Sequence, residues 1–212
     1  RHDAAKDYWD DALKNRFRLC ETLAVPSQRL KVPGQVHSDR VVFLEETDQL
    51  REVDAVFTVS PDVPILLHFA DCVPIILYER RKNSVCVIHA GWRGTAASIA
   101  RKAVENLVNK LKADPRHMVA AVGPAIGSCC YPTSDEAAAQ LATTISEASL
   151  FIERLEQPRP DLGAINAMQL LKAGVEEVDV CNLCTCCHPE LFYSHRHSGG
   201  ITGRQGAIAC LR

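Results

Sequence analysis

Apolar segments of strand length lie close together between residues 65 and 89, and they constrain the fold more than any other feature. Residues 65–69 and 73–78 are near-continuous apolar runs, separated only by Ala70-Asp71-Cys72. Short continuous apolar runs are typical of strands that are buried on both faces. Residues 84–89 form a further strand-like run. We therefore predict consecutive strands here, with Asp71 and Cys72 near the end of a sheet.

The rest of the chain predicts more strands and several amphipathic helices. Patterns typical of strands lie at residues 29–32, 36, 41–44, 54–59, 117–122, 175–180 and 207–211, with an aromatic strand around Phe192-Tyr193. Apolar spacing predicts helices at residues 4–24, 95–112, 135–145 and 164–173, the second capped by Thr95. Pro158-Arg159-Pro160 is expected to be a turn. Because strands and helices mix without strict alternation, and no linker or repeat interrupts them, we expect one α+β domain over residues 1–212.

Composition and charge exclude several classes of protein. Apolar residues make up 47% and charged residues 24% of the 212 positions, which is the balance of a globular protein rather than of a disordered chain or a coiled coil. The net charge is −2, so no basic excess indicates a nucleic-acid partner. Prolines and polar residues interrupt the most apolar stretch, residues 55–78, so we expect no membrane span.

The ten cysteines raise the question of disulfides, metal binding or thiol chemistry. Two groups are adjacent pairs, Cys129-Cys130 and Cys186-Cys187, and adjacent cysteines bridge to each other only with strain. We therefore expect a reduced, cytoplasmic protein in which most thiols are small buried side chains. The chain begins with Arg1 rather than Met, so its natural start is expected to be missing.

The sequence His-Ala-Gly-Trp-Arg-Gly at residues 89–94 follows a predicted strand and precedes a predicted helix. Helix N-termini favour anions, and Gly91 and Gly94 allow a close approach of the backbone. Arg93 adds a planar cation suited to phosphate or carboxylate. The alternative is an ordinary strand-to-helix turn with a packed Trp. The motif is not a P-loop, because the Gly-Lys-Ser/Thr ending is absent.

His37, Cys72 and His89 are nitrogen and sulfur ligands at the ends of short strands. Taken singly, each has a plainer interpretation as a core or surface histidine or a buried thiol. Two imidazoles and one thiolate form a known open zinc set, with a fourth position for water or substrate. The neighbouring Asp71 must be paired, solvated or functional, because an unpaired buried charge is costly.

Residues 181–188 hold a second group of candidate ligands, Cys181, Cys184, Cys186, Cys187 and His188. A structural zinc site there would lack the second, distant cysteine pair that such sites use, so a loop of reduced thiols is favoured. Residues 192–204 bring together aromatic residues, Arg196 and Arg204, which would suit an aromatic, polar ligand. The alternative is an aromatic core strand with solvated charges.

Seven motifs in order along the chain resemble a known family. They are Gln-Val-His-Ser at 35–38, Ala-Asp-Cys-Val-Pro at 70–74, His-Ala-Gly-Trp-Arg-Gly at 89–94, Gly-Pro-Ala-Ile-Gly-Ser-Cys-Cys-Tyr at 123–131, Cys-Thr at 184–185, Phe-Tyr-Ser-His-Arg at 192–196 and Thr-Gly-Arg at 202–204. On the basis of these motifs, nearly the whole chain resembles bacterial YfiH and YlmD proteins and mammalian laccase-domain-containing (FAMIN-type) proteins. This family is often labelled polyphenol oxidase.

The resemblance implies an α+β fold in which mixed sheets pack face to face between helices. It also implies a zinc-dependent enzyme that phosphorolyses adenosine, inosine, guanosine and methylthioadenosine to base and sugar phosphate, and that deaminates adenosine. The family's zinc ligands match His37, Cys72 and His89, one zinc per chain. For these reactions Asp71 is our candidate acid or base, and Arg93 with the expected helix start at Gly94-Thr95 is the candidate phosphate site. Gly91, Arg196 and Arg204 are further candidate contacts.

The sequence departs from the family pattern in two places. The family's N-terminal strand and polar segment are absent here, and the usual Tyr-Arg-Arg near the end is replaced by His195-Arg196-His197. A laccase holds several coppers through repeated His-x-His pairs, whereas this chain has eight His and a single such pair, so we reject multicopper oxidation. The alternatives that stay open are a cysteine hydrolase, with Cys72 as nucleophile and His37 or His89 as base, and a catalytically silent partner-binding module.

Overall fold

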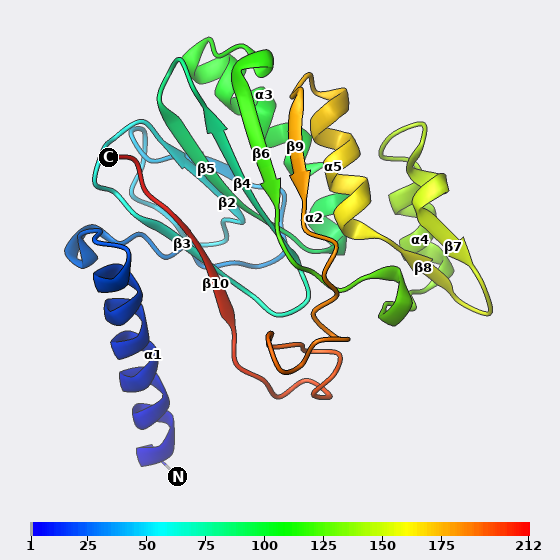
Figure 1. Cartoon of the computed structure of the whole chain (residues 1–212), viewed down its shortest axis with the longest axis horizontal. Helices are drawn as coiled ribbons and strands as arrows, with labels where there is room; N and C mark the ends of the chain where they lie inside the picture. Colours follow the sequence, from blue (N-terminus) through cyan, green and yellow to red (C-terminus); the bar gives the residue numbers. More distant parts are fainter. Residues whose placement is uncertain (1) are drawn as a thin grey trace.

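The centre of the fold is a six-stranded sheet in the order β1-β2-β5-β4-β6-β9 (Figure 1). The computed structural model describes residues 2–212, with side chains described at residues 11–153 and 155–212. The inner strands pair antiparallel, whereas β1 and β9 add in parallel at the two edges. The six strands are β1 (Val41–Phe43), β2 (Ala55–Thr58), β4 (Val73–Glu79), β5 (Ser84–Ala90), β6 (Met118–Val122) and β9 (Glu177–Val180).

Helices cover one face of this sheet. Side chains of β4 and β5 such as Ile75 and Ile88 pack with buried residues of two helices, including Ile99, Leu107 and Ile165. The helix residues that the apolar spacing marks as one face are therefore the ones that pack against the sheet. The helices of this layer and beside it are α2 (Trp92–Ala96), α3 (Ile99–Leu111), α4 (Asp135–Ala142) and α5 (Leu162–Lys172).

A smaller antiparallel sheet covers the other face. It consists of β3 (Ile65–Phe69) and β10 (Gln205–Ala209). Leu67 and Phe69 of β3 pack against Val56 and Val87 of the large sheet in a second apolar core. Because both faces of β4 and β5 are covered, these strands require nearly continuous apolar sequence. The predicted α+β fold with mixed strands and flanking helices is confirmed.

Shorter elements complete the chain. The helix α1 (His2–Thr22) lies at one corner of the molecule (Figure 1). Within residues 2–212, no helix combines the length and the apolar character needed to cross a bilayer. The remaining elements are β7 (Ile152–Arg154), β8 (Pro158–Pro160) and the 3₁₀ turns η1 (Ser27–Arg29), η2 (Pro115–His117), η3 (Ser128–Cys130) and η4 (Ala148–Phe151).

The predicted helix over residues 95–112 is wrong in its start and its continuity. The chain enters α2 at Trp92, with Gly91 as its N-cap, and α3 begins at Ile99. Ser98 separates the two helices in the left-handed region, at φ 60°. Helix α5 stabilises this break, because the Gln169 side chain donates a hydrogen bond to the carbonyl oxygen of Thr95 (2.9 Å).

Three further predictions are wrong. Residues 158–160 form the short strand β8 rather than a turn, and they pair with β7. No strand forms at Phe192-Tyr193, which lies in a turn region. Residues 29–32 and 36 form no strand either, although Lys31 and Gly34 each make an isolated bridge, to Ile65 and Arg51.

Candidate active site

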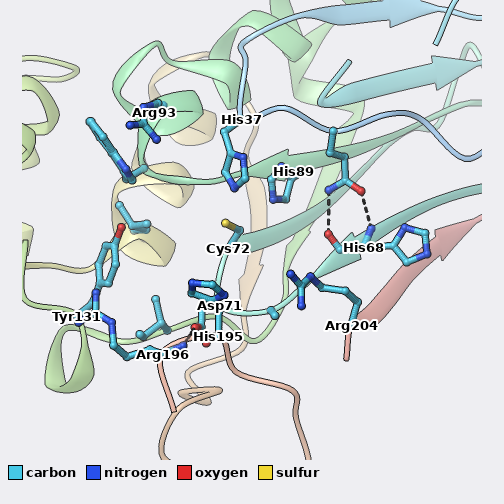
Figure 2. Close-up of a pocket in the computed structure, with 15 residues that line it drawn as sticks. His37, His68, Asp71, Cys72, His89, Arg93, Tyr131, His195, Arg196 and Arg204 are labelled. Atoms are coloured by element: carbon cyan, nitrogen blue, oxygen red, sulfur yellow. Dashed lines mark hydrogen bonds between the residues drawn. The ribbon is translucent and has the colours of Figure 1, made fainter. Parts of the chain in front are cut away.

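One pocket gathers most of the site residues that the sequence predicts. Its cavity of about 450 Å³ opens where the β3–β4 connection, the end of β5 and the loops around residues 126–131 and 195–204 meet (Figure 2). The predicted residues that line it are His37, Asp71, Cys72, His89, Arg93, Arg196 and Arg204. Gly91 and Gly94 do not line the cavity: Gly91 is the N-cap of α2, against His37 and Cys72, and Gly94 lies inside that helix.

The candidate ligands His37, Cys72 and His89 converge on one point. One nitrogen of each imidazole and the Cys72 Sγ all lie within 4.8 Å of one another. The sheet register brings two of them together, because Pro74 of β4 pairs with His89 of β5 and Cys72 immediately precedes β4. His37 comes from a non-strand segment, and its ring meets that of His89 edge to face at 4.9 Å. Figure 2 shows the sulfur directed toward both rings.

The buried carboxylate of Asp54 holds the ring of His89 and the backbone at His37 in place. Its Oδ1 contacts His89 Nδ1 at 2.8 Å and accepts the backbone N–H of His37 at 3.0 Å. Its Oδ2 accepts the N–H groups of Val36 (3.2 Å) and Ser38 (2.7 Å) and the Ser38 hydroxyl (2.7 Å). Burial acts to raise the pKa of Asp54, but the hydrogen bonds from His89 and Ser38 outweigh it and lower that pKa to about 2. The charged carboxylate therefore keeps the proton of His89 on Nδ1 and leaves Nε2 free to bind a metal.

The backbone beside the three ligands has no room for a side chain. A Cβ on Gly91 would lie 2.7 Å from His37 Cδ2 and 3.1 Å from Cys72 Sγ. Burial, with the carboxylates of Asp71 and Asp54, raises the pKa of the Cys72 thiol to about 12. Such a thiol stays protonated near pH 7 unless a cation binds the sulfur and the proton is released to solvent. Two imidazole nitrogens, one thiol and a glycine cradle fit a single Zn²⁺ with an open fourth position.

Asp71 joins the pocket to the C-terminal segment. It is 8% exposed and adopts φ 88°, a left-handed conformation that is rare for a residue with a side chain. Its Oδ1 accepts the hydroxyl of Thr185 (2.7 Å) and its Oδ2 accepts the N–H of Arg196 (2.7 Å). The carboxylate therefore orders the loop that closes one side of the cavity. Its role as an acid or base remains a prediction.

Three guanidinium groups surround the cavity, and among the described residues none of them contacts a carboxylate. Arg93 stacks on Trp92, with 4.6 Å from its Cζ to the ring centroid. Arg196 lies 5.3 Å from the ring centroid of Tyr131 and donates to backbone carbonyls. Arg204 also donates only to backbone carbonyls. These unneutralised charges favour an anion in the pocket.

The expected helix start at Gly94-Thr95 is wrong, whereas the role of Gly94 as a phosphate contact stays a prediction. Both residues lie inside α2 and are buried. A Cβ on Gly94 would approach the carbonyl oxygen of Ser38 at 3.1 Å, so this glycine allows close packing of the helix. The Thr95 hydroxyl accepts a hydrogen bond from Asn166 (2.8 Å) and does not cap the helix.

The structure adds pocket residues to which the sequence analysis gave no role in the site, among them His68, Tyr131 and His195. Burial and the charges of Arg16 and Arg204 lower the pKa of His68 to about 4, so this ring is neutral near pH 7. Burial raises the pKa of Tyr131 to about 12. The apolar run of β3 could have indicated His68, because it is the one polar residue in that strand. The Gln35 side chain pairs with the His68 backbone through two hydrogen bonds of 2.8 Å (Figure 2).

The fold and the site together define a laccase-like α+β protein. The chain belongs to the family described as multi-copper polyphenol oxidoreductase laccase, which it matches over residues 2–212. Within that family its relatives include the purine nucleoside phosphorylase YlmD of Geobacillus stearothermophilus, which is 36% identical in an alignment of 213 positions that covers 93% of this chain and 78% of the relative. YlmD of Bacillus subtilis is 32% identical and covers 92% of this chain and 75% of its own.

Solved structures agree with this assignment. The crystal structure of YlmD from Geobacillus stearothermophilus has a TM-score of 0.91 at 35% identity, covering 96% of this chain and 81% of that one. The Bacillus licheniformis protein YfiH has a TM-score of 0.90 at 30% identity, covering 94% and 80%. The predicted resemblance to YfiH and YlmD proteins is therefore confirmed.

Proposed function

We propose that this chain is a zinc-dependent purine nucleoside phosphorylase with adenosine deaminase activity. Its substrates would be adenosine, inosine, guanosine and methylthioadenosine, with phosphate as co-substrate. The observation that carries the proposal is the convergence of His37, Cys72 and His89 within a cavity that also holds three arginines without carboxylate partners. The names of the YlmD relatives support a purine nucleoside substrate.

His37, Cys72 and His89 would hold the metal, and Asp54 would fix the ring of His89. A bound zinc supplies a Lewis acid and lowers the pKa of its water toward neutrality. Arg93, assisted by Arg196 and Arg204, would bind and orient the phosphate. Asp71 would carry the proton that deamination moves, as a carboxylate does in other zinc deaminases.

The same geometry supports metal binding over a cysteine nucleophile. Within the described side chains, no hydrogen bond joins Cys72 Sγ to His37 or His89, whereas a thiol nucleophile needs its base within hydrogen-bond reach. Two imidazoles lie close to the Cys72 sulfur, whereas a cysteine nucleophile needs only one imidazole as its base. The ligand set also favours zinc over several coppers, because among the described residues this is the one group of three or more possible ligands that contains histidine.

The test is an assay of adenosine with phosphate, in which adenine, sugar phosphate and inosine are separated. We expect His37→Ala and His89→Ala each to abolish phosphorolysis and deamination together, because both reactions depend on one metal. His117→Ala is the matched control, since this residue lies in η2, outside the pocket, and it should keep both activities. Loss of only one activity in either ligand variant would contradict the shared metal.

A further inference from the structure

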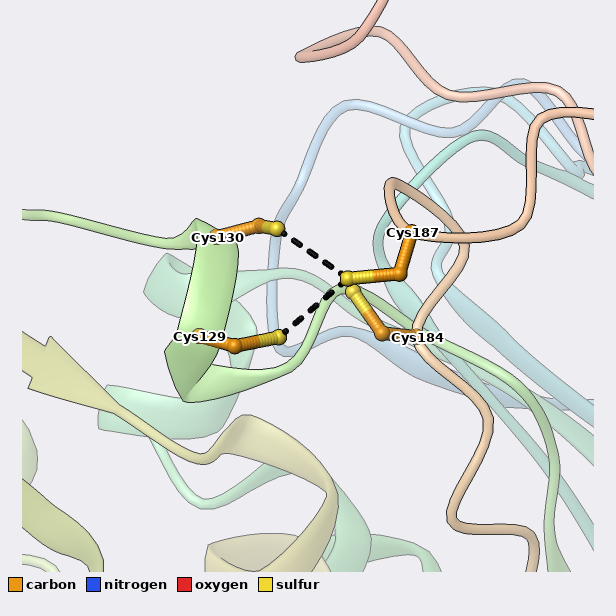
Figure 3. Close-up of side chains that lie close together, drawn as sticks. All are labelled: Cys129, Cys130, Cys184 and Cys187. Atoms are coloured by element: carbon orange, nitrogen blue, oxygen red, sulfur yellow. Dashed lines mark hydrogen bonds between the residues drawn. The ribbon is translucent and has the colours of Figure 1, made fainter.

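Four cysteines meet outside the pocket, although they are far apart in the sequence. Cys129 and Cys130 belong to η3, and Cys184 and Cys187 belong to the loop after β9 (Figure 3). The Cys187 Sγ lies 3.6 Å from the Sγ of Cys129 and 3.4 Å from that of Cys130. All four sulfurs lie within 4.8 Å of one another. Cys129-Cys130 is therefore the second, distant cysteine pair that a structural zinc site near residue 184 requires.

The sulfur spacing matches one tetrahedral metal ion. A disulfide needs two sulfurs about 2.05 Å apart, closer than any contact described in this cluster. Four sulfurs at about 2.3 Å from a central Zn²⁺ lie about 3.8 Å from each other, close to the observed 3.4 and 3.6 Å. An iron–sulfur cluster requires a wider arrangement, because its four thiolates are then divided among two or four irons. The geometry selects a mononuclear site.

The surrounding groups suit a site of negative charge. The backbone N–H of Gly127 donates to Cys184 Sγ at 3.3 Å, as thiolate ligands commonly require. Four thiolates around a divalent ion leave a net charge of −2, which follows from the formal charges. Two guanidiniums lie beside it: Arg159 donates to the carbonyl oxygen of Cys129 (2.6 Å) and Arg196 to that of Cys130 (3.3 Å). Neither guanidinium has a carboxylate partner among the described residues.

We propose that Cys129, Cys130, Cys184 and Cys187 bind a structural Zn²⁺. This ion would fasten the loop before Tyr131 to the segment that runs from Thr185 to Arg196. Both segments supply pocket wall, because Tyr131 and Arg196 line the cavity and Thr185 holds Asp71. The site is separate from the one at His37, Cys72 and His89, and it does not depend on the proposed phosphorylase activity.

The test measures metal content and sulfur coordination of the full chain, purified under reducing conditions without chelator. We expect two zinc ions per wild-type chain by elemental analysis. Cys72→Ala should lose one zinc, and X-ray absorption of the zinc that remains should show four sulfur ligands at about 2.3 Å. Cys187→Ser should lose the other zinc, whereas Cys181→Ser, an exposed cysteine outside the cluster, should keep both.

The measurement on Cys72→Ala keeps the proposal testable even if Cys187→Ser does not fold. Nitrogen ligands on the remaining zinc, a chain that holds no zinc after Cys72→Ala, or iron in place of zinc would overturn it. A disulfide within the cluster under these conditions, detected by mass spectrometry, would overturn it as well. One zinc with four sulfur ligands in both wild type and Cys72→Ala would support this site and contradict the metal of the proposed phosphorylase.

Discussion

Asp54→Asn is the substitution that most sharply tests how the pocket is built. The amide has the size of the carboxylate, but only one of its two ends accepts hydrogen bonds. Placing the NH₂ group at Oδ2 would deprive Val36 N–H and Ser38 N–H of their acceptor. Placing it at Oδ1 deprives His37 N–H and forces His89 Nδ1 to become an acceptor. In that case the proton of His89 moves to Nε2, and the ring loses the lone pair that would bind zinc.

The expected losses follow from these contacts. Hydrogen bonds to charged groups contribute about 1.5–3 kcal/mol each, so losing two at a fully buried carboxylate costs about 3–6 kcal/mol of unfolding free energy. We expect about 3 kcal/mol, because His37 is exposed and water can reach its N–H. Loss of a partner that orients a metal ligand weakens metal binding by about 10–100-fold.

Urea unfolding and zinc titration with a competing chelator measure the two effects. Glu45→Gln is the matched control, because Thr58 Oγ1, Val59 N–H and the Ser60 donors all use the single oxygen Oε1 of Glu45. An amide oxygen can keep all of these bonds, so stability and zinc affinity should change little. If Asp54→Asn matches wild type in both unfolding free energy and zinc affinity, neither oxygen of Asp54 makes the contribution that its contacts predict, and the role given to Asp54 is contradicted.

The same carboxylate predicts how stability depends on pH in the metal-free chain. The pKa of Asp54 falls from 3.8 to about 2 on folding, so its stabilisation is complete above pH 3.8 and is lost as the pH falls toward 2. The difference corresponds to about 2 kcal/mol. Urea unfolding at several values between pH 2 and 5 should show this loss in wild type and not in Asp54→Asn. Parallel pH profiles for the two proteins would contradict it.

Three further substitutions have defined outcomes. Gly91→Ala leaves the backbone unstrained, because φ is −73° there, but it places a methyl group 2.7 Å from His37 Cδ2. We therefore expect loss of the pocket zinc with an unchanged circular dichroism spectrum, and full zinc content would contradict the need for a glycine beside the ligands. Arg93→Gln should raise the KM for phosphate more than the KM for nucleoside. The control Arg101→Gln should change neither, because Arg101 pairs with Glu105 on α3; an unchanged phosphate KM in Arg93→Gln would exclude Arg93 as a phosphate ligand. Thr185→Val removes the buried donor to Asp71 and should lower the unfolding free energy by about 1–3 kcal/mol in urea, a result that an unaltered midpoint would contradict.

The central strands were predictable because burial imposes a local pattern. Residues 65–69 of the small sheet, and 73–78 and 84–89 of the large one, lie in the strands that the apolar runs predict. The turn between the first two runs also placed Asp71 and Cys72 correctly at a strand end. Cys72 and His89 therefore carry a local signal, whereas His37 does not, because the strand predicted at residue 36 does not form.

The break between α2 and α3 was not predictable from local pattern. Apolar spacing continues through Ala97 and Ser98, so the sequence indicates one helix. The end of α2 is instead satisfied by α5, through the hydrogen bonds of Asn166 and Gln169 to Thr95. Such a partner more than 70 residues away overrides the local preference.

Contacts between distant segments also explain the other features that the local sequence did not predict. Asp54 is an ordinary acidic residue in a strand-like sequence, and only the fold shows that it holds His37 and His89. The cysteine cluster unites Cys129-Cys130 with Cys184 and Cys187. Cys184 and Cys187 have the C-x-x-C spacing of metal sites, but no local pattern links them to the adjacent pair Cys129-Cys130, more than 50 residues earlier. Pairing with β7 gives Pro158–Pro160 an extended conformation that the two prolines alone do not predict.

The most direct test of the proposed function is product formation by the zinc-loaded wild-type chain with inosine and phosphate. Hypoxanthine and sugar phosphate should form in equal amounts, product formation should stop when a chelator removes the metal, and added zinc should restore it. A zinc-loaded chain that forms no product, or a rate that does not depend on the metal, would contradict the assignment of His37, Cys72 and His89 as the centre of a nucleoside phosphorylase.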